Sequence, residues 1–553
     1  MKLTKAALII LCACAGPLTA QSYLSGTVYR ADGKTPVQAD IVLTSIDGQA
    51  GWNELQAVKA SPDGTFSLTV EKPGTYRLWV CMPDHFAKSV PLVVKENERI
   101  SFELTAAPYF WKDSIDAVEI VGSWNDYAAN RAEPMHRRAD GTFIYSRPVS
   151  EDTVGYQLKG LLAMGSRPVN GTQADYFEYD GHGTYRSMLH VRGDSVHIVF
   201  DPARLFRVAA DADVPKITFD AEHRNLEELF ALTLARNENI LATVRAYDKH
   251  MQEHGDPQGF SFRDSSYIAI LEETIQRSED EAVRQMAAVN LLTQVVNMED
   301  KRRETVVEMM EVIPPDSPWL ALQRGQSVMM IAMLAPEEKS EGYLKKVLES
   351  NPEKSVRGQV VAHYVNKYAK KDPEKFQHYY EMLKNEFADL PSARFTLMRH
   401  NPERVIQAGK PVPDFEVGLM DSEEKVSRQS LLGKTYLMDF WAVWCGPCVA
   451  EMPSLHTAYE KFKDKGLIIL SLSFDQKPED VHKFRAEKWP MPWLHTFIEG
   501  GGNSELAKRF EVVGIPKPIL VGPDGTILAL EGELRGQALE KTLAKYLGDV
   551  SEK

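Results

Sequence analysis

The sequence has few cysteines for its length, no long apolar run beyond its first residues, and no surplus of positive charge. Only 5 cysteines occur among 553 residues, which excludes a fold held together by many disulfides. No run of 18 apolar residues follows the N-terminus, so we expect no membrane-spanning helix. The formal net charge of -14 argues against a nucleic-acid partner, because phosphate binding needs an excess of Lys and Arg.

The first twenty residues have the features of a signal peptide. A basic start precedes a short apolar stretch from Ala6 to Ala15, and small residues before Gln21 form a cleavage site. Alternatively, Cys14 in "LCAC" is the lipidated first residue of a bacterial lipoprotein. In both cases we expect residues 1–20 to direct export, to the periplasm or the cell envelope, where disulfides persist.

The next two segments read as β-domains. Residues 21–107 alternate apolar and polar positions between Gly, Pro and Asp turns, and "SPDGTF" is a strong hairpin motif. This segment resembles the β-sandwich of carboxypeptidase-regulatory modules. Residues 108–205 resemble an early-set, glycogen-binding-type sandwich, in which a tryptophan at the position of Tyr127 stacks on sugar. Trp124 and Tyr127 would either contact a glycan or pack the edge of the sandwich.

From 215 to 400 the apolar residues recur at the spacing expected for amphipathic helices. One predicted helix carries an apolar stripe, formed by Val283, Met286, Ala287, Leu291 and Val295. Pro352 and Pro373 fit the first turns of later helices. Consecutive amphipathic helices of this kind favour a TPR-like or irregular α-solenoid, although no strict repeat is visible.

Residues 405–553 alternate strands with helices, which predicts an α/β fold around a central sheet. We expect helices from Pro447, near 477–488, over 503–510 and over 536–547. The fold class is therefore multidomain: two β-sandwiches, a helical middle and a C-terminal α/β domain.

Cleavage at the predicted site leaves three cysteines. Cys81 lies in a predicted strand and is either a packed thiol or a regulatory one. Cys445 and Cys448 form a Cys-x-x-Cys pair. A structural zinc site needs four ligands, and the sequence offers no second pair and only His456 nearby. A structural disulfide would close too small a loop to stabilise much. We therefore predict redox chemistry, with no metal and no cofactor.

The neighbours of the pair support that prediction. Cys445 precedes a helix that opens at Pro447, and the helix N-terminus lowers a thiol pKa from about 8.5 toward 7. Cys448, one turn further along, would be more buried. It would resolve the mixed disulfide that Cys445 forms.

The stretch "DFWAVWCGPC" resembles the active site of the thioredoxin superfamily, and "WCGPCVAEMP" is similar to its exported TlpA/ResA-like branch. The resemblance implies a thioredoxin fold, a Cys445–Cys448 redox disulfide, and a cis peptide between Ile515 and Pro516 that packs against the cysteines and pairs with an extended substrate. The dipeptide Gly446-Pro447 is the one found in reducing thioredoxins.

The resemblance also assigns roles to three neighbouring side chains, and Lys517 is a departure from it. Asp439 would be buried and accept the proton of Cys448. Glu451 would lie one turn beyond that cysteine, unless it is a solvated first-turn residue. Trp444 would shield the site and touch substrate. Lys517, where the branch usually has threonine, is either a cation beside the site or a surface lysine.

The predicted function is that of an exported thiol-disulfide oxidoreductase that reduces protein disulfides and contributes to cell redox homeostasis. The resemblance implies recharging by a membrane electron donor of the periplasmic reducing pathway, with cytochrome c maturation as one pathway. An alternative is a binding scaffold, for a protein or for a glycan through 108–205, with an accessory redox domain. A thiol peroxidase is disfavoured, because it needs a lone cysteine in a different context.

Overall fold

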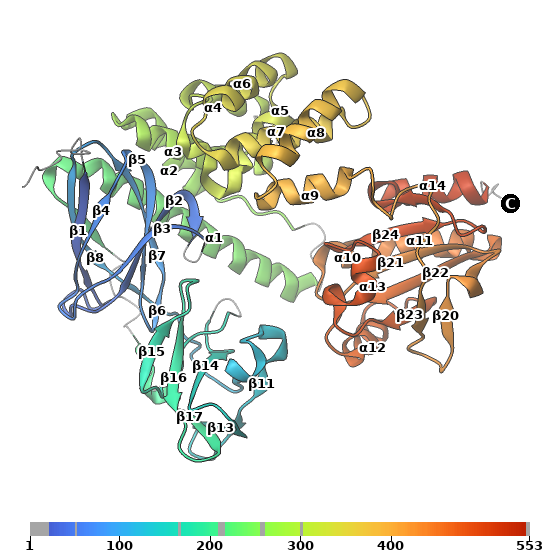
Figure 1. The fold of residues 1–553 in the computed structure, drawn as a ribbon, viewed down its shortest axis with the longest axis horizontal. Helices are drawn as coiled ribbons and strands as arrows, with labels where there is room; N and C mark the ends of the chain where they lie inside the picture. The colour runs from blue at the N-terminus through green and yellow to red at the C-terminus, as the bar shows by residue number, and fades with distance from the viewer. Residues whose placement is uncertain are drawn as a thin grey trace, which may run out of the picture. The chain divides into compact units, whose positions relative to one another are not determined.

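The computed structural model describes residues 21–49, 52–163, 167–207, 216–254, 260–298 and 302–548. The predicted signal peptide and Cys14 lie outside the described residues. The chain divides into two compact units (Figure 1): one comprises Met1–Ile240 and Arg263–His363, and the other comprises Leu241–Phe262 and Tyr364–Lys553. The predicted domain boundaries stay predictions.

The first unit begins with two four-stranded sheets. One has the order β18-β8-β1-β4, with bounds Ile217–Phe219, Arg99–Thr105, Ser22–Tyr29 and Thr65–Val70. The other has the order β3-β2-β5-β7, with bounds Trp52–Lys59, Asp40–Gln49, Gly74–Cys81 and Lys88–Val94. Alternating buried and exposed residues along β4 and β8 place one face of the first sheet in the core. Residues 217–219 are thus a strand, although the sequence predicts the helical part from 215.

A second β-region follows. Its larger sheet has the order β11-β10-β14-β16-β15, with bounds Glu133–Pro134, Glu119–Gly122, Thr153–Lys159, Tyr185–His190 and Tyr176–Tyr179. Its smaller sheet has the order β12-β13-β17, with bounds His136–Arg137, Phe143–Pro148 and Ser195–Phe200. A two-stranded ladder of β6 (His85–Phe86) and β9 (Ala107–Pro108) precedes it.

The aromatic residues of this region are engaged within it. The Trp124 ring stacks on Tyr145 at 5.4 Å, and its Nε1 donates to Glu133. The Arg186 guanidinium lies 4.1 Å from the centre of the Tyr127 ring. These contacts favour the interpretation of Trp124 and Tyr127 as packing residues.

Cys81 lies at the end of β5 and is fully buried. It forms no disulfide in the described structure, and its Sγ lies 4.0 Å from the Tyr179 hydroxyl. Burial raises the pKa of the Cys81 thiol to about 12. Cys81 is therefore a packed, protonated thiol at neutral pH.

The middle of the chain is helical. In the part of this region that the structure describes, nine α-helices follow one another, namely α1 (Arg224–His254), α2 (Ser265–Arg277), α3 (Glu281–Gln294), α4 (Arg302–Val312), α5 (Gln326–Leu334), α6 (Glu337–Ser350), α7 (Lys354–Tyr368), α8 (Pro373–Glu386) and α9 (Pro391–His400). The predicted stripe on α3 is buried. Pro373 lies in the first turn of α8 as predicted, but Pro352 precedes α7, which begins at Lys354. Among the described residues, no helix combines the length and apolar composition needed to cross a membrane.

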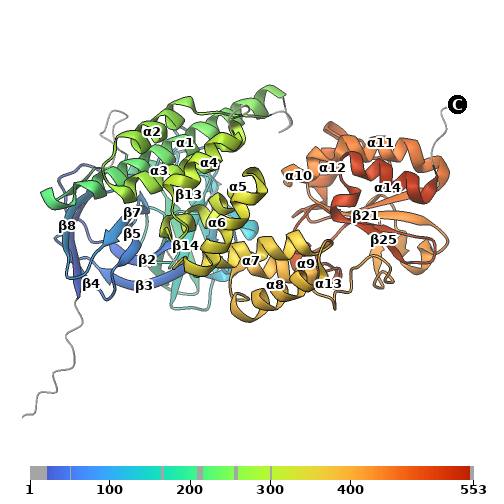
Figure 2. The same cartoon turned by 90° about the horizontal axis from the view of Figure 1, so that it is seen from above.

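The C-terminal part is an α/β layer structure. Its sheet has the order β23-β22-β21-β24-β25, with bounds Leu494–Phe497, Leu467–Ser473, Thr435–Trp441, Lys517–Val521 and Ile527–Leu530. A small hairpin of β19 (Glu416–Gly418) and β20 (Lys425–Ser427) precedes β21. The helices are α10 (Gly446–Ala450), α11 (Met452–Phe462), α12 (Pro478–Glu487), α13 (Glu505–Arg509) and α14 (Gln537–Leu547), and α11 packs beside α14 (Figure 2). This confirms the α/β prediction for this part of the chain.

The strand β21 occupies the centre of that sheet and is buried along its whole length. It pairs in parallel with β22 and antiparallel with β24. Burying each large apolar side chain of such a strand contributes about 1.5–3 kcal/mol. Only three residues connect the end of this buried strand to Cys445, so the strand restricts where the cysteine pair lies.

Candidate active site

The two cysteines lie at the start of α10 and form a disulfide. Cys445 is the N-cap residue, and its Sγ accepts a hydrogen bond from the backbone N–H of Cys448 at 3.2 Å. Pro447 lies in the first turn, where it costs no helical hydrogen bond. Cys445 is 5% exposed and Cys448 is 1% exposed, so both are buried in the disulfide form and Cys448 is the more buried of the two.

Asp475 anchors the segment in front of the cysteines, a role that the sequence analysis missed. Its carboxylate accepts the N–H of Val443 at 3.0 and 3.1 Å and the Ser473 hydroxyl at 2.8 Å. Asp475 is 4% exposed, and burial raises the pKa of its carboxyl group. An acid just after an apolar strand, in "LSLSFD", was the available signal, since a buried acid needs partners.

Replacing this anchor should loosen the segment. We expect Asp475→Ala to accelerate hydrogen exchange of the Val443 amide at least tenfold, because a hydrogen bond to a charged group contributes about 1.5–3 kcal/mol. The Leu437 amide, in the middle of β21, is the internal reference, and Asp464→Ala on the surface is the matched control. Unchanged exchange at Val443 would show that Asp475 does not hold the segment.

Asp439 lies in β21 and is 4% exposed. Burial, and after it the negative charge of Glu451, raise its pKa from 3.8 to about 7, whereas Arg535 lowers it. The carboxyl group therefore changes its protonation state near neutral pH, which a proton acceptor needs. The burial that the sequence predicts for Asp439 is confirmed.

Glu451 lies between α10 and α11, and its side chain is 21% exposed. Its carboxylate accepts Arg535 Nε at 3.1 Å and the N–H of Gly536 at 2.7 Å. The alternative of a solvated first-turn residue is therefore wrong. Arg535 could not be identified as the partner of Glu451 from the sequence, because it lies 84 positions further along the chain.

The Ile515–Pro516 peptide is cis, as predicted. Ile515 packs against the core cluster that contains both cysteines. Lys517 is 5% exposed and donates from Nζ to the backbone oxygen of Glu511 at 2.6 Å. The surface alternative for Lys517 is therefore wrong. Burial, and the nearby charge of Arg404, lower the Lys517 pKa to about 8.

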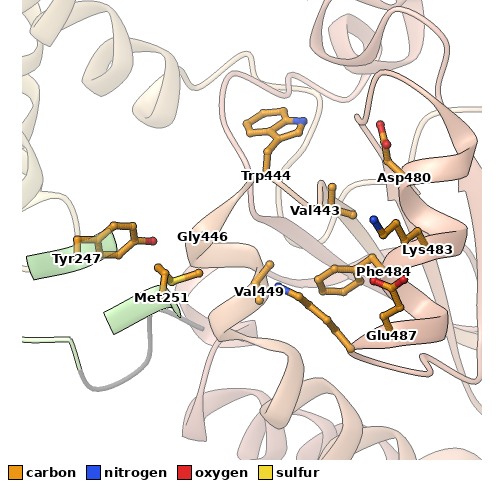
Figure 3. A pocket seen from close by; sticks show the side chains of 11 residues that line it. Tyr247, Met251, Val443, Trp444, Gly446, Val449, Asp480, Lys483, Phe484 and Glu487 are labelled. Atoms are coloured by element: carbon orange, nitrogen blue, oxygen red, sulfur yellow. The ribbon is translucent and has the colours of Figure 1, made fainter. Parts of the chain in front are cut away.

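Trp444 is 63% exposed, in line with a surface aromatic at the site. A cavity of about 370 Å³ lies beside it (Figure 3), within the second compact unit. Its wall consists of Val443, Trp444, Gly446 and Val449 from the cysteine segment, of α12 side chains including Asp480, Lys483, Phe484 and Glu487, and of Tyr247 and Met251. The wall thus offers apolar surface and both signs of charge next to Gly446.

His456, the histidine near the pair, packs between two tryptophans. Its ring centre lies 5.1 Å from Trp489 and 4.9 Å from Trp493, so both tryptophans take part in local packing. In the described part of the chain, no three His, Cys, Asp or Glu side chains are grouped so that they could hold a metal ion.

A thioredoxin-like family model matches residues 433–527. The chain is 30% identical over 162 residues to the thiol-disulfide oxidoreductase ResA of Bacillus cereus, covering 28% of this chain and 87% of the relative. It is 35% identical over 120 residues to a tryparedoxin of Trypanosoma brucei brucei, covering 21% of this chain and 81% of the relative. A solved thioredoxin domain of a Bacteroides vulgatus thiol-disulfide oxidoreductase is 32% identical, covering 26% of this chain and 99% of that one, with a TM-score of 0.24.

The matched residues are those that build the cysteine site, and the ResA match extends over most of that relative. The C-terminal part of the chain is an enzyme domain with a Cys-x-x-Cys redox pair. Through this domain, the chain belongs to the ResA-like family of thioredoxin-fold thiol-disulfide oxidoreductases.

Proposed function

We propose that the protein is exported and reduces disulfides in other proteins. The observation that carries this proposal is the disulfide between two cysteines at one helix start, with Cys445 at the N-cap and Cys448 one turn further in. In the reduced pair, Cys445 would attack the substrate disulfide and Cys448 would act afterwards as the resolving thiol. The similarity to ResA, a thiol-disulfide oxidoreductase, and the dipeptide Gly446-Pro447 support the same chemistry.

The proposed reduction takes two successive thiol-disulfide exchange steps. The Cys445 thiolate attacks one substrate sulfur, forms a mixed disulfide and releases the other substrate sulfur as a thiolate, which takes up a proton. Cys448 loses its proton to Asp439 and attacks Cys445. The Cys445–Cys448 disulfide forms and releases the second substrate sulfur as a thiolate, which takes up a proton, so the substrate leaves as a dithiol that has gained two electrons. A separate donor then supplies two electrons to restore the pair.

The surroundings give each group its task in this proposal. Asp439 titrates near neutral pH and is therefore able to take the proton and later release it. Glu451, fixed by Arg535 and Gly536, keeps a negative charge beside Asp439 and favours its protonated form. The backbone beside Pro516 would pair with the substrate segment, and Trp444 would cover it.

The reducing direction predicts a low redox potential. Full-length protein equilibrated in dithiothreitol or glutathione buffers, then alkylated and weighed by mass spectrometry, should give a potential below about -200 mV, close to the about -270 mV of thioredoxin. Insulin reduction should be detectable with the same protein. A potential near the about -120 mV of a strong oxidant would contradict the reducing direction and indicate an oxidase.

Export, lipidation and the electron donor are also proposals. The sequence of residues 1–20 supports export, and Cys14 is the candidate lipid site. We infer that a membrane donor of the periplasmic reducing pathway recharges the pair, with cytochrome c maturation as one pathway. Fractionation of cells that produce the full chain, with N-terminal sequencing of the mature form, tests export: a cytoplasmic, uncleaved product would overturn it.

We further propose that the two β-regions are sandwiches and the helical region a TPR-like solenoid, together serving recognition. About three quarters of the chain lies outside the ResA match, which keeps a binding scaffold, with protein or glycan as ligand, as the second candidate function. Pull-down and glycan-array binding by the full chain with Cys445→Ser and Cys448→Ser discriminates the two. Tight, specific binding without the cysteines would make the redox domain accessory.

A further inference from the structure

The cis-proline loop, residues 511–517, joins α13 to β24 and carries the backbone that an extended substrate would meet. Ile515, just before the cis-proline, packs against the core cluster that includes both cysteines. An added strand is recognised through main-chain hydrogen bonds, so its fit depends on where this backbone lies. The contacts that hold the two ends of the loop therefore matter for substrate docking.

Lys517 connects those two ends. Its Nζ donates to the backbone oxygen of Glu511 at 2.6 Å, so the side chain spans the base of the loop. Lys517 is opposite Phe440 in the pairing of β24 with β21. Successive side chains of a strand point to opposite faces, so Lys517 and Asp439 lie on different faces of the sheet. Lys517 is therefore poorly placed for proton transfer with Asp439 and well placed to hold the loop.

The other end of the loop is held as firmly. Glu511 has a φ of 50°, a left-handed conformation that such a side chain rarely adopts unless its surroundings impose it. Its carboxylate accepts the N–H of Val405 at 3.0 Å and Nε of Arg404 at 3.1 Å. Arg404 is only 7% exposed. Arg404 and Val405 thus hold Glu511 in place. The carbonyl oxygen of Glu511 in turn accepts the hydrogen bond from Lys517 Nζ.

We propose that Lys517 is a positioning residue that holds the cis-proline loop in the geometry needed to dock an extended, disulfide-bearing peptide segment. This inference rests on the proposed reductase function and adds a residue to it. Burial makes the positive charge of Lys517 inaccessible to a substrate. The side chain acts instead through its hydrogen bond, which links residue 517 to residue 511.

The test compares two substrates of the full-length chain in a Cys448→Ser background. One is a cysteine heptapeptide and the other is mercaptoethanol, each linked by a disulfide to thionitrobenzoate. In both cases Cys445 bonds to the peptide or mercaptoethanol sulfur, and thionitrobenzoate leaves as a coloured thiolate. Only the peptide can pair with the loop. The ratio of the two rates therefore isolates docking from the reactivity of Cys445.

We expect Lys517→Met to lower this ratio at least tenfold, and Lys517→Arg, which keeps a long donor, to stay within about twofold of the parent. Lys508→Met, at an exposed lysine near the loop, is the matched control and should leave the ratio unchanged. If Lys517→Met does not fold, Lys517→Gln, with a shorter polar side chain and no ammonium group, gives the same reading.

An unchanged ratio in Lys517→Met would overturn the positioning role, whether both rates keep their parent values or fall in parallel. No reaction of the Cys448→Ser parent with either disulfide would instead overturn the proposed function, and the positioning role with it. The two failures are therefore distinguishable.

Discussion

Replacing Cys445 by serine should reduce insulin-disulfide turnover by at least about a thousandfold, to the rate without enzyme. A hydroxyl group at this position cannot form the mixed disulfide, and no other thiol in the described structure is suited to replace it. Cys448 is 1% exposed and Cys81 is buried with its pKa raised to about 12. The thiolate is the attacking species, so a protonated, buried thiol contributes almost nothing.

Two cysteine variants serve as controls for this prediction. Cys448→Ser should still attack once, releasing one equivalent of substrate thiol and then stopping, because the resolving thiol is missing. Cys81→Ser should keep turnover within about twofold of the parent. Turnover that persists in Cys445→Ser, or disappears in Cys81→Ser, would contradict the assignment of the nucleophile.

Asp439→Asn should stabilise the C-terminal domain at pH 8. The folded-state pKa of about 7 lies above that of an unfolded Asp, about 3.9. The folded state therefore binds the extra proton, and this contribution is fully present below about pH 4 and lost as the pH rises through 7. The two pKa values differ by about three, and each pH unit corresponds to about 1.4 kcal/mol. The ionised carboxylate therefore lowers the free energy of unfolding by about 4 kcal/mol. Asparagine removes that cost.

Native-state hydrogen exchange of the β21 and β22 amides in the full chain measures this effect. The opening free energy of the parent should fall between pH 4 and 8, whereas that of Asp439→Asn should stay nearly level and exceed the parent's at pH 8 by about 2–4 kcal/mol. Asp464→Asn, on the surface, is the control. A parent-like loss of stability in Asp439→Asn would show that another group titrates.

The same substitution should slow the resolving step. In the proposed reaction Asp439 accepts the proton of Cys448, and general-base assistance of this kind typically contributes about 10²–10⁴-fold. We expect the mixed disulfide to accumulate in Asp439→Asn and the rate midpoint near pH 7 to disappear. In the parent, Asp439 would therefore speed the attack of Cys448 on the mixed disulfide and at the same time make the domain less stable.

The local pattern of the sequence was sufficient for much of this site. The helix start at the cysteines follows from residues adjacent in the chain. The burial of Asp439 and the cis peptide before Pro516 follow from the resemblance to the thioredoxin superfamily. The helices of the middle region follow from apolar spacing and from acidic N-caps such as Asp280, which accepts the N–H of Val283 at 3.0 Å. Such features depend on short-range geometry, which a sequence displays directly.

The remaining features depend on pairings between distant residues. Asp475 reaches Val443 across 32 positions, and Arg535 reaches Glu451 across 84. The burial of Lys517 follows from the pairing of β24 with β21, which no pattern around Lys517 reveals. The placement of residues 217–219 in the first sheet has the same origin, because β18 pairs with β8 more than a hundred positions earlier.

Trapping the mixed disulfide tests the central claim most directly. Full-length Cys448→Ser, produced in cells and acid-quenched, should carry adducts that disappear on reduction, with mass spectrometry identifying a substrate cysteine joined to Cys445. The matched variant with both Cys445→Ser and Cys448→Ser should carry none. Equal adducts in the two variants, or adducts joined to Cys81, would contradict the assignment of Cys445 as the nucleophile of a protein-disulfide reductase.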